Sequence, residues 1–184
     1  MKRPLAWLAA AGILVAAGAV VALAPQEQWA QGPIPVAVGL DEEGTGRNIQ
    51  ATIHSVAVAE SLEVTGEDWA GDTEGIWVVV EVTAQNRVNP AGIQSSLLIG
   101  DLEFRGTDRL DYSGLEQWVL VPGLPTSGPV AFEIPRDLAG ERAVVMLGLG
   151  SDSRLDSVIT TTVELGELPV LPTLAVAPAG RTER

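Results

Sequence analysis

The sequence predicts an all-β protein: an antiparallel β-sandwich preceded by one N-terminal transmembrane helix. Three observations lead to this prediction. Residues 5–24 contain no charged side chain, and a helix of about 20 apolar residues spans the hydrocarbon core of a bilayer. Short segments with alternating apolar and polar residues follow from residue 49, as in half-buried strands. No segment after residue 25 has a helical period, so we expect the body to contain strands.

The N-terminal segment, residues 1–24, is interpreted as an uncleaved signal-anchor. Lys2 and Arg3 precede the apolar run, so the N-terminus is expected in the cytoplasm and the remainder outside the cell membrane. The run is longer than the roughly 7–15 residues of a signal-peptide core, and Pro25 directly follows the small-residue site at residues 22–24. Cleavage there, giving a secreted protein, is the alternative.

Composition excludes several chemistries. The chain has no cysteine, which rules out disulfides, thiolate metal sites and cysteine nucleophiles. His54 is the only histidine, which argues against a serine–histidine–aspartate triad or a multi-histidine metal site. The formal net charge is −13, and such a surface repels nucleic acid. We therefore expect no nucleic-acid partner and no cofactor.

The chain after residue 24 divides into three parts. Residues 25–48 are a predicted tether rich in proline and glycine, and residues 49–165 are the predicted sandwich domain. Residues 166–184 are a predicted proline-rich tail, of which residues 171–176 fit one edge strand. The acidic run at residues 41–43 is read as a solvated charge run, because the spaced ligands of a calcium loop are missing.

Seven segments of the body have strand character, separated by turn-forming residues. They are residues 49–60, 76–86, 95–104, 116–121, 129–134, 141–149 and 155–165. This spacing predicts a two-sheet sandwich, with a closed barrel as the alternative. Strict alternation in 49–60 places Ile53 and Ser55 on one face and His54, Val56 and Val58 on the other. In 76–86, Val78, Val80, Val82 and Ala84 share a face, and the end at Trp77 and Val79 is apolar on both sides.

Several sequence motifs together point to a family. Residues 77–86 (WVVVEVTAQN) are a valine-rich strand ending on Asn, a strand with DLEF at 101–104 and Tyr112 follow, and residues 117–135 read QWVLVPGLPTSGPVAFEIP. This order resembles the immunoglobulin-like domain of unknown function found in bacterial secreted lipoproteins and membrane-anchored proteins. The resemblance covers roughly residues 49–165. It implies a sandwich outside the cell with no assigned catalysis, although the chain lacks a lipid-accepting cysteine.

Trp69 is the first candidate for a functional contact. It lies in 67-EDWAGDTEG-75, among acids and glycines, where no core pattern explains a large aromatic. Aromatic residues anchor protein partners, so Trp69 is predicted to contact a partner together with Asp68 and Asp72. Trp77 and Trp118, in contrast, are expected to fill the core.

The remaining polar residues receive structural interpretations. His54 is read as an exposed or hydrogen-bonded histidine with no nucleophile at a recognisable spacing. Asp101 and Glu103 are expected to face water while Leu102 and Phe104 take the core side. Two further aspartate pairs, Asp108/Asp111 and Asp152/Asp156, are expected to form turns. No catalytic, cofactor or metal site is predicted.

These observations favour a membrane-anchored extracytoplasmic interaction module without catalytic activity, an accessory to an envelope protein complex. Its partner would be an envelope protein or a cell-wall polymer. One alternative is a carboxylate-dependent hydrolase or a carbohydrate-binding or carbohydrate-active protein. A calcium-stabilised domain built on one of the aspartate pairs is another.

Overall fold

The computed structural model describes residues 7, 12–18, 32–150 and 154–182. The chain forms two compact units, Met1–Gly32 and Pro33–Arg184. In the first unit, residues 12–18 are helical. Among the described residues, no helix has the length and apolar character that crossing a membrane requires. Most of the predicted transmembrane segment 5–24 lies outside the described residues, so the membrane span stays a prediction without support from this structure.

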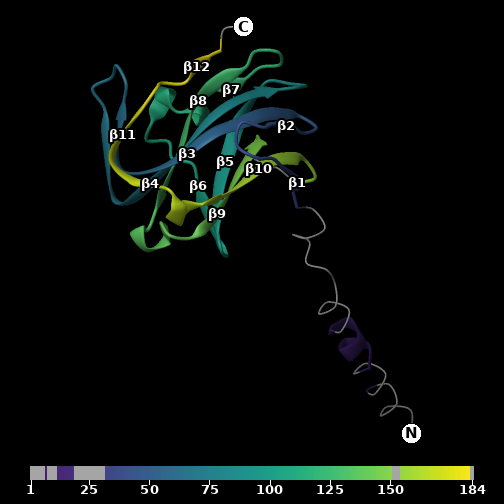
Figure 1. Cartoon of the computed structure of the whole chain (residues 1–184). Coiled ribbons are helices and arrows are strands. Elements are labelled where there is room, and N and C mark those ends of the chain that lie inside the picture. Colours follow the sequence, from purple (N-terminus) through teal and green to yellow (C-terminus); the bar gives the residue numbers. More distant parts are fainter. Residues whose placement is uncertain (1–6, 8–11, 19–31, 151–153, 183–184) are drawn as a thin grey trace. The chain divides into compact units, whose positions relative to one another are not determined.

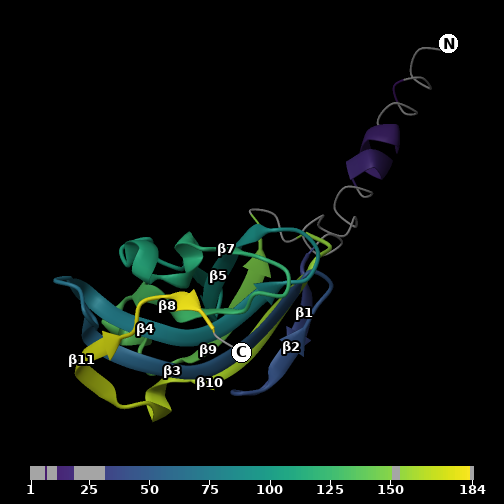
Figure 2. The ribbon, with the colours of Figure 1, turned by 90° about the horizontal axis from the view of Figure 1, so that it is seen from above.

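The second unit is a sandwich of two six-stranded sheets, seen in Figure 1 and turned in Figure 2. Sheet A has the order β1-β10-β9-β5-β6, with β7 paired to β5; sheet B has the order β11-β3-β4-β8-β12, with β2 paired to β3. Neighbouring strands are antiparallel except for the pairs β1–β10 and β11–β3. The predicted sandwich is therefore confirmed, and the barrel alternative is wrong.

The strand bounds are as follows. Sheet A contains β1 (Ile34–Ala37), β5 (Ala91–Ile99), β6 (Leu102–Arg105), β7 (Val119–Leu120), β9 (Arg142–Leu149) and β10 (Ser157–Glu164). Sheet B contains β2 (Glu43–Thr45), β3 (Ile49–Val64), β4 (Ala70–Asn86), β8 (Thr126–Ile134), β11 (Val170–Val176) and β12 (Gly180–Arg181). Four single-turn helices connect them: η1 (Asp111–Ser113), η2 (Leu115–Gln117), η3 (Arg136–Leu138) and η4 (Leu165–Glu167).

The sheets extend beyond the predicted domain 49–165. Strands β1 and β2 come from the predicted tether, and β11 and β12 come from the predicted tail. Proline is tolerated in such segments because edge strands leave one row of N–H groups unpaired; β11, which contains Pro172, borders only β3. The predicted strand 116–121 is mostly wrong, since η2 occupies its first half and only Val119–Leu120 pairs in a sheet.

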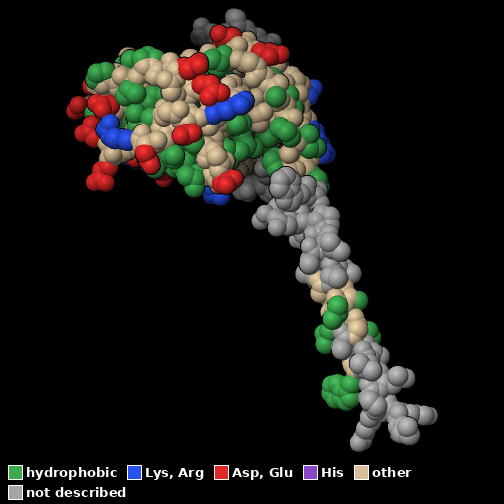
Figure 3. Space-filling model, turned by 60° about the horizontal axis from the view of Figure 1, so that its bottom comes forward, with side chains coloured by type: hydrophobic (Ala, Val, Ile, Leu, Met, Phe, Trp, Pro, Cys, Tyr) green, Lys and Arg blue, Asp and Glu red, His purple; other side chains and the backbone are tan. Residues whose placement is uncertain are grey.

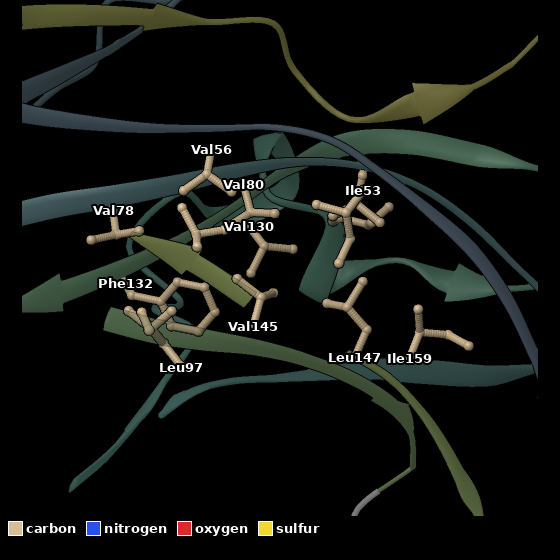
Figure 4. Close-up of a cluster of buried hydrophobic side chains, with 14 of the residues drawn as sticks. Ile53, Val56, Val78, Val80, Leu97, Val130, Phe132, Val145, Leu147 and Ile159 are labelled. Atoms are coloured by element: carbon tan, nitrogen blue, oxygen red, sulfur yellow. The ribbon is translucent and has the colours of Figure 1, made fainter. Parts of the chain in front are cut away.

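The main core fills the space between the two sheets (Figure 4). Val78 and Val80 of β4 point inward as predicted and meet side chains from sheet A such as Leu97 and Leu147, all of them fully buried. Phe132 of β8 is also fully buried in this core. Burying each such side chain stabilises the fold by about 1.5–3 kcal/mol, so this layer is the main source of stability.

The predicted alternation of β3 is wrong after Ile53. Ile53 pairs with Val82 and Ser55 pairs with Glu81, so the register shifts at His54. A bulge adds one residue to a strand and changes the phase of its two-residue period. Val56 and Val58 consequently join the inner core, whereas both His54 and Ser55 are exposed. Sequence alternation alone does not reveal this insertion.

A second apolar cluster lies on the outer face of sheet B. It is formed by Ala59, Leu62, Val64, Trp77, Val79, Leu110, Ala131 and Val176. This cluster confirms that the end of β4 at Trp77 and Val79 is covered on both sides. The segment between β11 and β12 crosses this face of the sheet (Figure 2), and the Ala179 N–H donates to the Ser113 carbonyl at 2.9 Å. The predicted tail thus acts as a strap across sheet B.

Candidate functional site

The β3–β4 hairpin carries the predicted contact residues Trp69, Asp68 and Asp72. Its loop, residues 65–69, turns at Gly66, which has φ +86°, a conformation that favours glycine. Two bonds hold the loop against neighbouring segments. The Thr65 N–H donates to the Val176 carbonyl at 2.8 Å, and the Ser113 hydroxyl donates to the Glu67 carboxylate at 2.7 Å. The loop is therefore a fixed feature of the surface.

Trp69 is half-buried, which the sequence analysis did not anticipate. One part of its ring packs against the second apolar cluster. The ring also covers Gly71 so closely that a Cβ atom there would collide with it. The other part lines an open hollow of about 490 Å³, formed by residues 63–70 and Ala175. Trp69 therefore combines a structural contact with an accessible aromatic surface.

The carboxylates beside Trp69 face solvent. Asp68 and Asp72 are exposed, and neither carboxylate makes a hydrogen bond or ion pair among the described residues. Only the backbone of Asp72 is engaged, because its carbonyl accepts a hydrogen bond from Arg109 at 2.9 Å. Glu63 and Glu74 are exposed on the same hairpin. Figure 3 shows acidic side chains gathered at the end of the sandwich where this hairpin lies. The tip thus presents an aromatic ring among carboxylates.

The other two tryptophans of the sandwich, Trp77 and Trp118, differ from each other. Trp77 is fully buried, and its Nε1–H donates to the Gly71 carbonyl at 3.0 Å, so its prediction as a core residue is confirmed. The same prediction for Trp118 is wrong. Trp118 is half-buried, and the Arg181 guanidinium lies over its ring at 5.6 Å. Because η2 replaces the predicted strand, Leu115 and Leu120 reach the core in this region instead.

The predicted carboxylate pairs do not form a shared site among the described residues. Glu103 accepts a hydrogen bond from Ser96 at 2.6 Å and is exposed like Asp101. Phe104 packs against the core as expected, but Leu102 is 53% exposed, because β6 is a short edge strand. The turn at Asp108 and Asp111 is confirmed by the bond from the Asp111 N–H to the Asp108 carbonyl at 2.9 Å.

The third carboxylate pair, Asp152 and Asp156, is only partly described. Asp152 lies outside the described residues. Asp156 accepts a hydrogen bond from the Asn48 side chain at 2.7 Å and another from the Ser157 N–H at 2.8 Å. In the described part of the chain, no three histidine or carboxylate side chains gather closely enough to hold a metal ion.

Sequence reasoning missed a half-buried carboxylate, Glu116. Both the N–H and the hydroxyl of Ser95 donate to its Oε1 atom. Burial raises the pKa of the Glu116 carboxyl, while the Ser95 hydrogen bonds lower it and the nearby Asp108 charge raises it. A Cβ atom on Gly106 would collide with both Glu116 and Ser95. Glu116 thus fastens the loop after β6 onto β5, and no sequence motif marks this contact.

Sequence reasoning also missed the partners of His54. His54 is exposed and hydrogen-bonded as expected, but it contacts a hydroxyl group. Its Nδ1 lies 2.9 Å from Asp41 Oδ1, and its Nε2 lies 2.8 Å from Thr83 Oγ1. These residues are 13 and 29 positions from His54 in the sequence. Only the pairing of β3 with β4 and the return of the β2 segment bring them together.

Comparison with known proteins gives a fold but no function. No family model and no curated protein matches the chain. An uncharacterised β-sandwich protein from Clostridium difficile is similar in structure, with a TM-score of 0.51 and 7% sequence identity over 76% of this chain and 99% of that chain. The yjhA protein from Bacillus subtilis aligns with a TM-score of 0.45 and 16% identity, over 67% of this chain and 98% of that chain. The first likeness supports the β-sandwich fold alone.

Proposed function

We propose that the chain is an immunoglobulin-like interaction module without catalytic activity, an accessory to an envelope protein complex. Residues 5–24 would hold it in the cell membrane with the sandwich outside. The charge-free run after Lys2 and Arg3 supports the anchor. An N-terminal segment that is cleaved, leaving a secreted domain, is the alternative for this part of the proposal.

The observation that carries the binding role is the surface of the β3–β4 hairpin. A half-buried Trp69 lines a hollow of about 490 Å³ beside the exposed Asp68 and Asp72. Aromatic side chains with one face held by packing are frequent anchors of protein interfaces. Carboxylates around such an anchor attract a positively charged surface and repel an acidic one. The partner that fits is therefore an envelope protein with a basic surface, rather than a wall polymer.

Affinity capture after crosslinking tests this proposal. The tagged full-length chain is captured from detergent-solubilised membranes beside two charge variants. Asp68→Asn combined with Asp72→Asn removes the two carboxylates next to Trp69 on the hairpin without altering the packing of Trp69. Asp101→Asn combined with Glu103→Gln removes the same number of charges from β6 and the turn before it, on the other sheet, and serves as the matched control.

We expect a defined membrane protein to be captured by the parent and by the β6 control, and much less of it by the hairpin variant. Raising the salt concentration from 0.1 M to 1 M shortens the Debye length from about 10 Å to about 3 Å, so capture by the parent should decrease. If the two double variants capture equally, the hairpin is not the contact surface. If the parent captures no defined protein, the interaction module is the wrong interpretation.

A further inference from the structure

Five polar side chains form a continuous hydrogen-bonded row across the outer face of sheet B. The row begins with the Asp41–His54–Thr83 contacts described above. Thr83 Oγ1 lies 2.7 Å from Ser127 Oγ, and Ser127 Oγ lies 2.6 Å from Thr182 Oγ1. The row thus runs from the turn before β2, across β3, β4 and β8, to the residue after β12.

The backbone conformation brings the first three residues of the row together, with Asp41 and Thr83 each within hydrogen-bonding distance of His54. His54 is the extra residue of the bulge in β3, and bulges re-aim side chains near functional sites. Asp41 has φ +58°, a conformation that aspartate tolerates better than most residues, and its N–H donates to the Ile53 carbonyl at 2.8 Å. Thr83 lies opposite Ser127 in the β4–β8 register. No local sequence pattern specifies these positions, because each depends on how the strands pair in the folded chain.

An ionised Asp41 carboxylate and a neutral His54 imidazole together set the direction of each hydrogen bond in the row. An ionised carboxylate only accepts, so His54 Nδ1 must donate to it. In a neutral imidazole the other nitrogen, Nε2, then accepts, and the Thr83 hydroxyl is its donor. Since Thr83 has one hydroxyl proton, Ser127 must donate to Thr83, and Thr182 must donate to Ser127. All hydroxyl protons therefore point toward His54.

The contacts from Asp41 to His54 and from His54 to Thr83 have the arrangement of an activated nucleophile. A hydroxyl within hydrogen-bond reach of a histidine, itself oriented by a carboxylate, is the arrangement by which enzymes activate serine or threonine. The imidazole is accessible, since the His54 side chain is 43% exposed, and Thr83 is half-buried. A hollow of about 60 Å³ lies beside Thr83, lined among others by Gln50, Gln85 and Pro125. Because a water molecule takes about 30 Å³ of liquid, this space suits a small acyl group.

We propose that Thr83 is an acylation site, which accepts a small acyl group from an activated ester with His54 as general base and Asp41 as positioning residue. Thr83 Oγ1 forms a bond to the carbonyl carbon, and its proton passes to His54 Nε2. The bond between that carbon and the leaving oxygen breaks, and the leaving group departs as an alkoxide or phenolate. The imidazolium then returns its proton to solvent, which leaves an ester on Thr83. The reaction is stoichiometric, so it goes beyond the proposed binding role and does not depend on it.

The full-length chain in detergent, treated with p-nitrophenyl acetate, provides the test. We expect a stoichiometric burst of p-nitrophenolate and an acetyl group on the peptide that contains Thr83, located by fragmentation mass spectrometry. Acetylation of a lysine amine is distinguished from acetylation of Thr83 by its position in the sequence, because the only lysine of the chain is Lys2. If acetyl groups are found only on residues other than Thr83, the proposal is overturned and the row is a structural feature of the sheet.

Four variants separate activation from structure. Thr83→Val keeps the β-branched shape and should abolish the adduct, whereas Thr83→Ser should retain it. His54→Gln should slow acylation by at least about 100-fold, as expected for loss of a general base. Thr52→Val is the matched control, because Thr52 faces Thr83 across the β3–β4 pair without contacting His54, and its adduct should be unchanged. Equal labelling of the parent and of a folded Thr83→Val variant would overturn the proposal.

The positioning role of Asp41 is tested separately, by measuring the tautomer of His54. His54 is the only histidine, so the two imidazole nitrogen resonances in an NMR spectrum report its tautomer without ambiguity. In the parent we expect the proton on Nδ1, and in Asp41→Asn we expect a mixture of tautomers together with slower acylation. An unchanged tautomer and an unchanged acylation rate would show that Asp41 does not position His54.

Discussion

Trp77 and Trp118 show how environment decides what a tryptophan contributes. Both occur in apolar stretches of the sequence, yet only Trp77 is enclosed on all sides, with its Nε1–H bonded to the Gly71 carbonyl and the Arg109 guanidinium 5.1 Å above its ring. Trp118 contacts Arg181 from the surface. The difference arises because β4 is covered on both faces, whereas Trp118 follows a single-turn helix at the edge of the fold.

Replacement of each tryptophan by alanine should therefore give unequal losses. Trp77→Ala leaves a large cavity, and we expect the free energy of unfolding to decrease by about 3–5 kcal/mol. Trp118→Ala removes a cation–π contact with Arg181 and the hydrogen bond from the Trp118 Nε1–H to the Tyr112 carbonyl at 2.9 Å, and the expected loss is about 1–2.5 kcal/mol. Urea denaturation followed by circular dichroism measures both changes. Similar losses for the two variants would mean that Trp118 is a core residue after all.

Glu116 makes the stability depend on pH in a direction opposite to that of a salt-bridged carboxylate. Burial raises its pKa in the folded state, so the folded state binds the proton more tightly than the unfolded state does. This group's contribution to stability is fully present below the unfolded pKa and is lost as the pH rises through the raised folded pKa. Glu116→Gln keeps an acceptor for Ser95 and removes the titration.

The parent should accordingly lose stability relative to Glu116→Gln as the pH rises from the ordinary glutamate pKa through the raised pKa of Glu116 in the folded state. Urea denaturation of both proteins at each pH unit gives this difference. A difference for Glu116→Gln that is constant across the range contradicts the assignment.

At the scale of elements, the C-terminal strap depends on one glycine. Gly128 of β8 lies beneath the crossing segment, and a Cβ atom there would lie 2.7 Å from the Ala179 Cα. The strap is held beyond this point by the Ala179 N–H and by the Thr182 N–H, which donates to the Pro125 carbonyl at 3.0 Å. A side chain on Gly128 must push the strap away from the sheet.

Gly128→Ala should therefore release the strap without unfolding the sandwich. Overpacking of this kind costs about 1–3 kcal/mol, so hydrogen exchange at the Ala179 and Thr182 amides should become faster on the order of 10- to 100-fold. Gly180→Ala is the matched control, because a Cβ atom on Gly180 of β12 meets nothing within 4 Å. Unchanged exchange in Gly128→Ala would show that the strap adapts to the added methyl group.

The elements that the sequence predicted are those stabilised by their own pattern. The run of valines in β4 alternates with polar residues and carries a strand signal by itself, and its inward face is the one that the alternation indicates. Strands β1, β2 and β12 contain only 2 to 4 residues each, too few for a period to emerge. They form because a longer neighbour offers unpaired backbone groups at its edge.

The same reasoning explains the candidate sites. Trp69, Asp68 and Asp72 are adjacent in the sequence, so a local pattern was enough to select them. The contact of His54 with Asp41 and Thr83 requires a bulge and two strand pairings, none of which has a local signature. Glu116 and Ser95 likewise meet only after the loop folds back on β5. Contacts of this kind depend on tertiary structure and are outside the reach of sequence patterns.

At the scale of the whole molecule, the proposed function gives the two units different roles: the first attaches the chain to the membrane, and the second folds and binds the partner. Both apolar clusters and all twelve strands lie within the unit Pro33–Arg184. A domain of about 150 residues buries roughly 68–70% of the surface of its unfolded chain, which is sufficient for independent stability. The few residues of the first unit that the structure describes supply no strand to either sheet. Folding and membrane attachment are therefore expected to be separable.

A fragment of residues 33–184 provides the test of this separation. It should fold alone, with the same urea midpoint as the full-length chain, because both apolar clusters of the described residues are formed by side chains that this fragment contains. In cells, the full-length chain should sediment with membranes and resist extraction at high salt, which weakens charge contacts but leaves apolar insertion intact, whereas the fragment should remain in the supernatant. A fragment that sediments equally would place membrane attachment in the sandwich, and a lower midpoint for the fragment would mean that the first unit stabilises the fold.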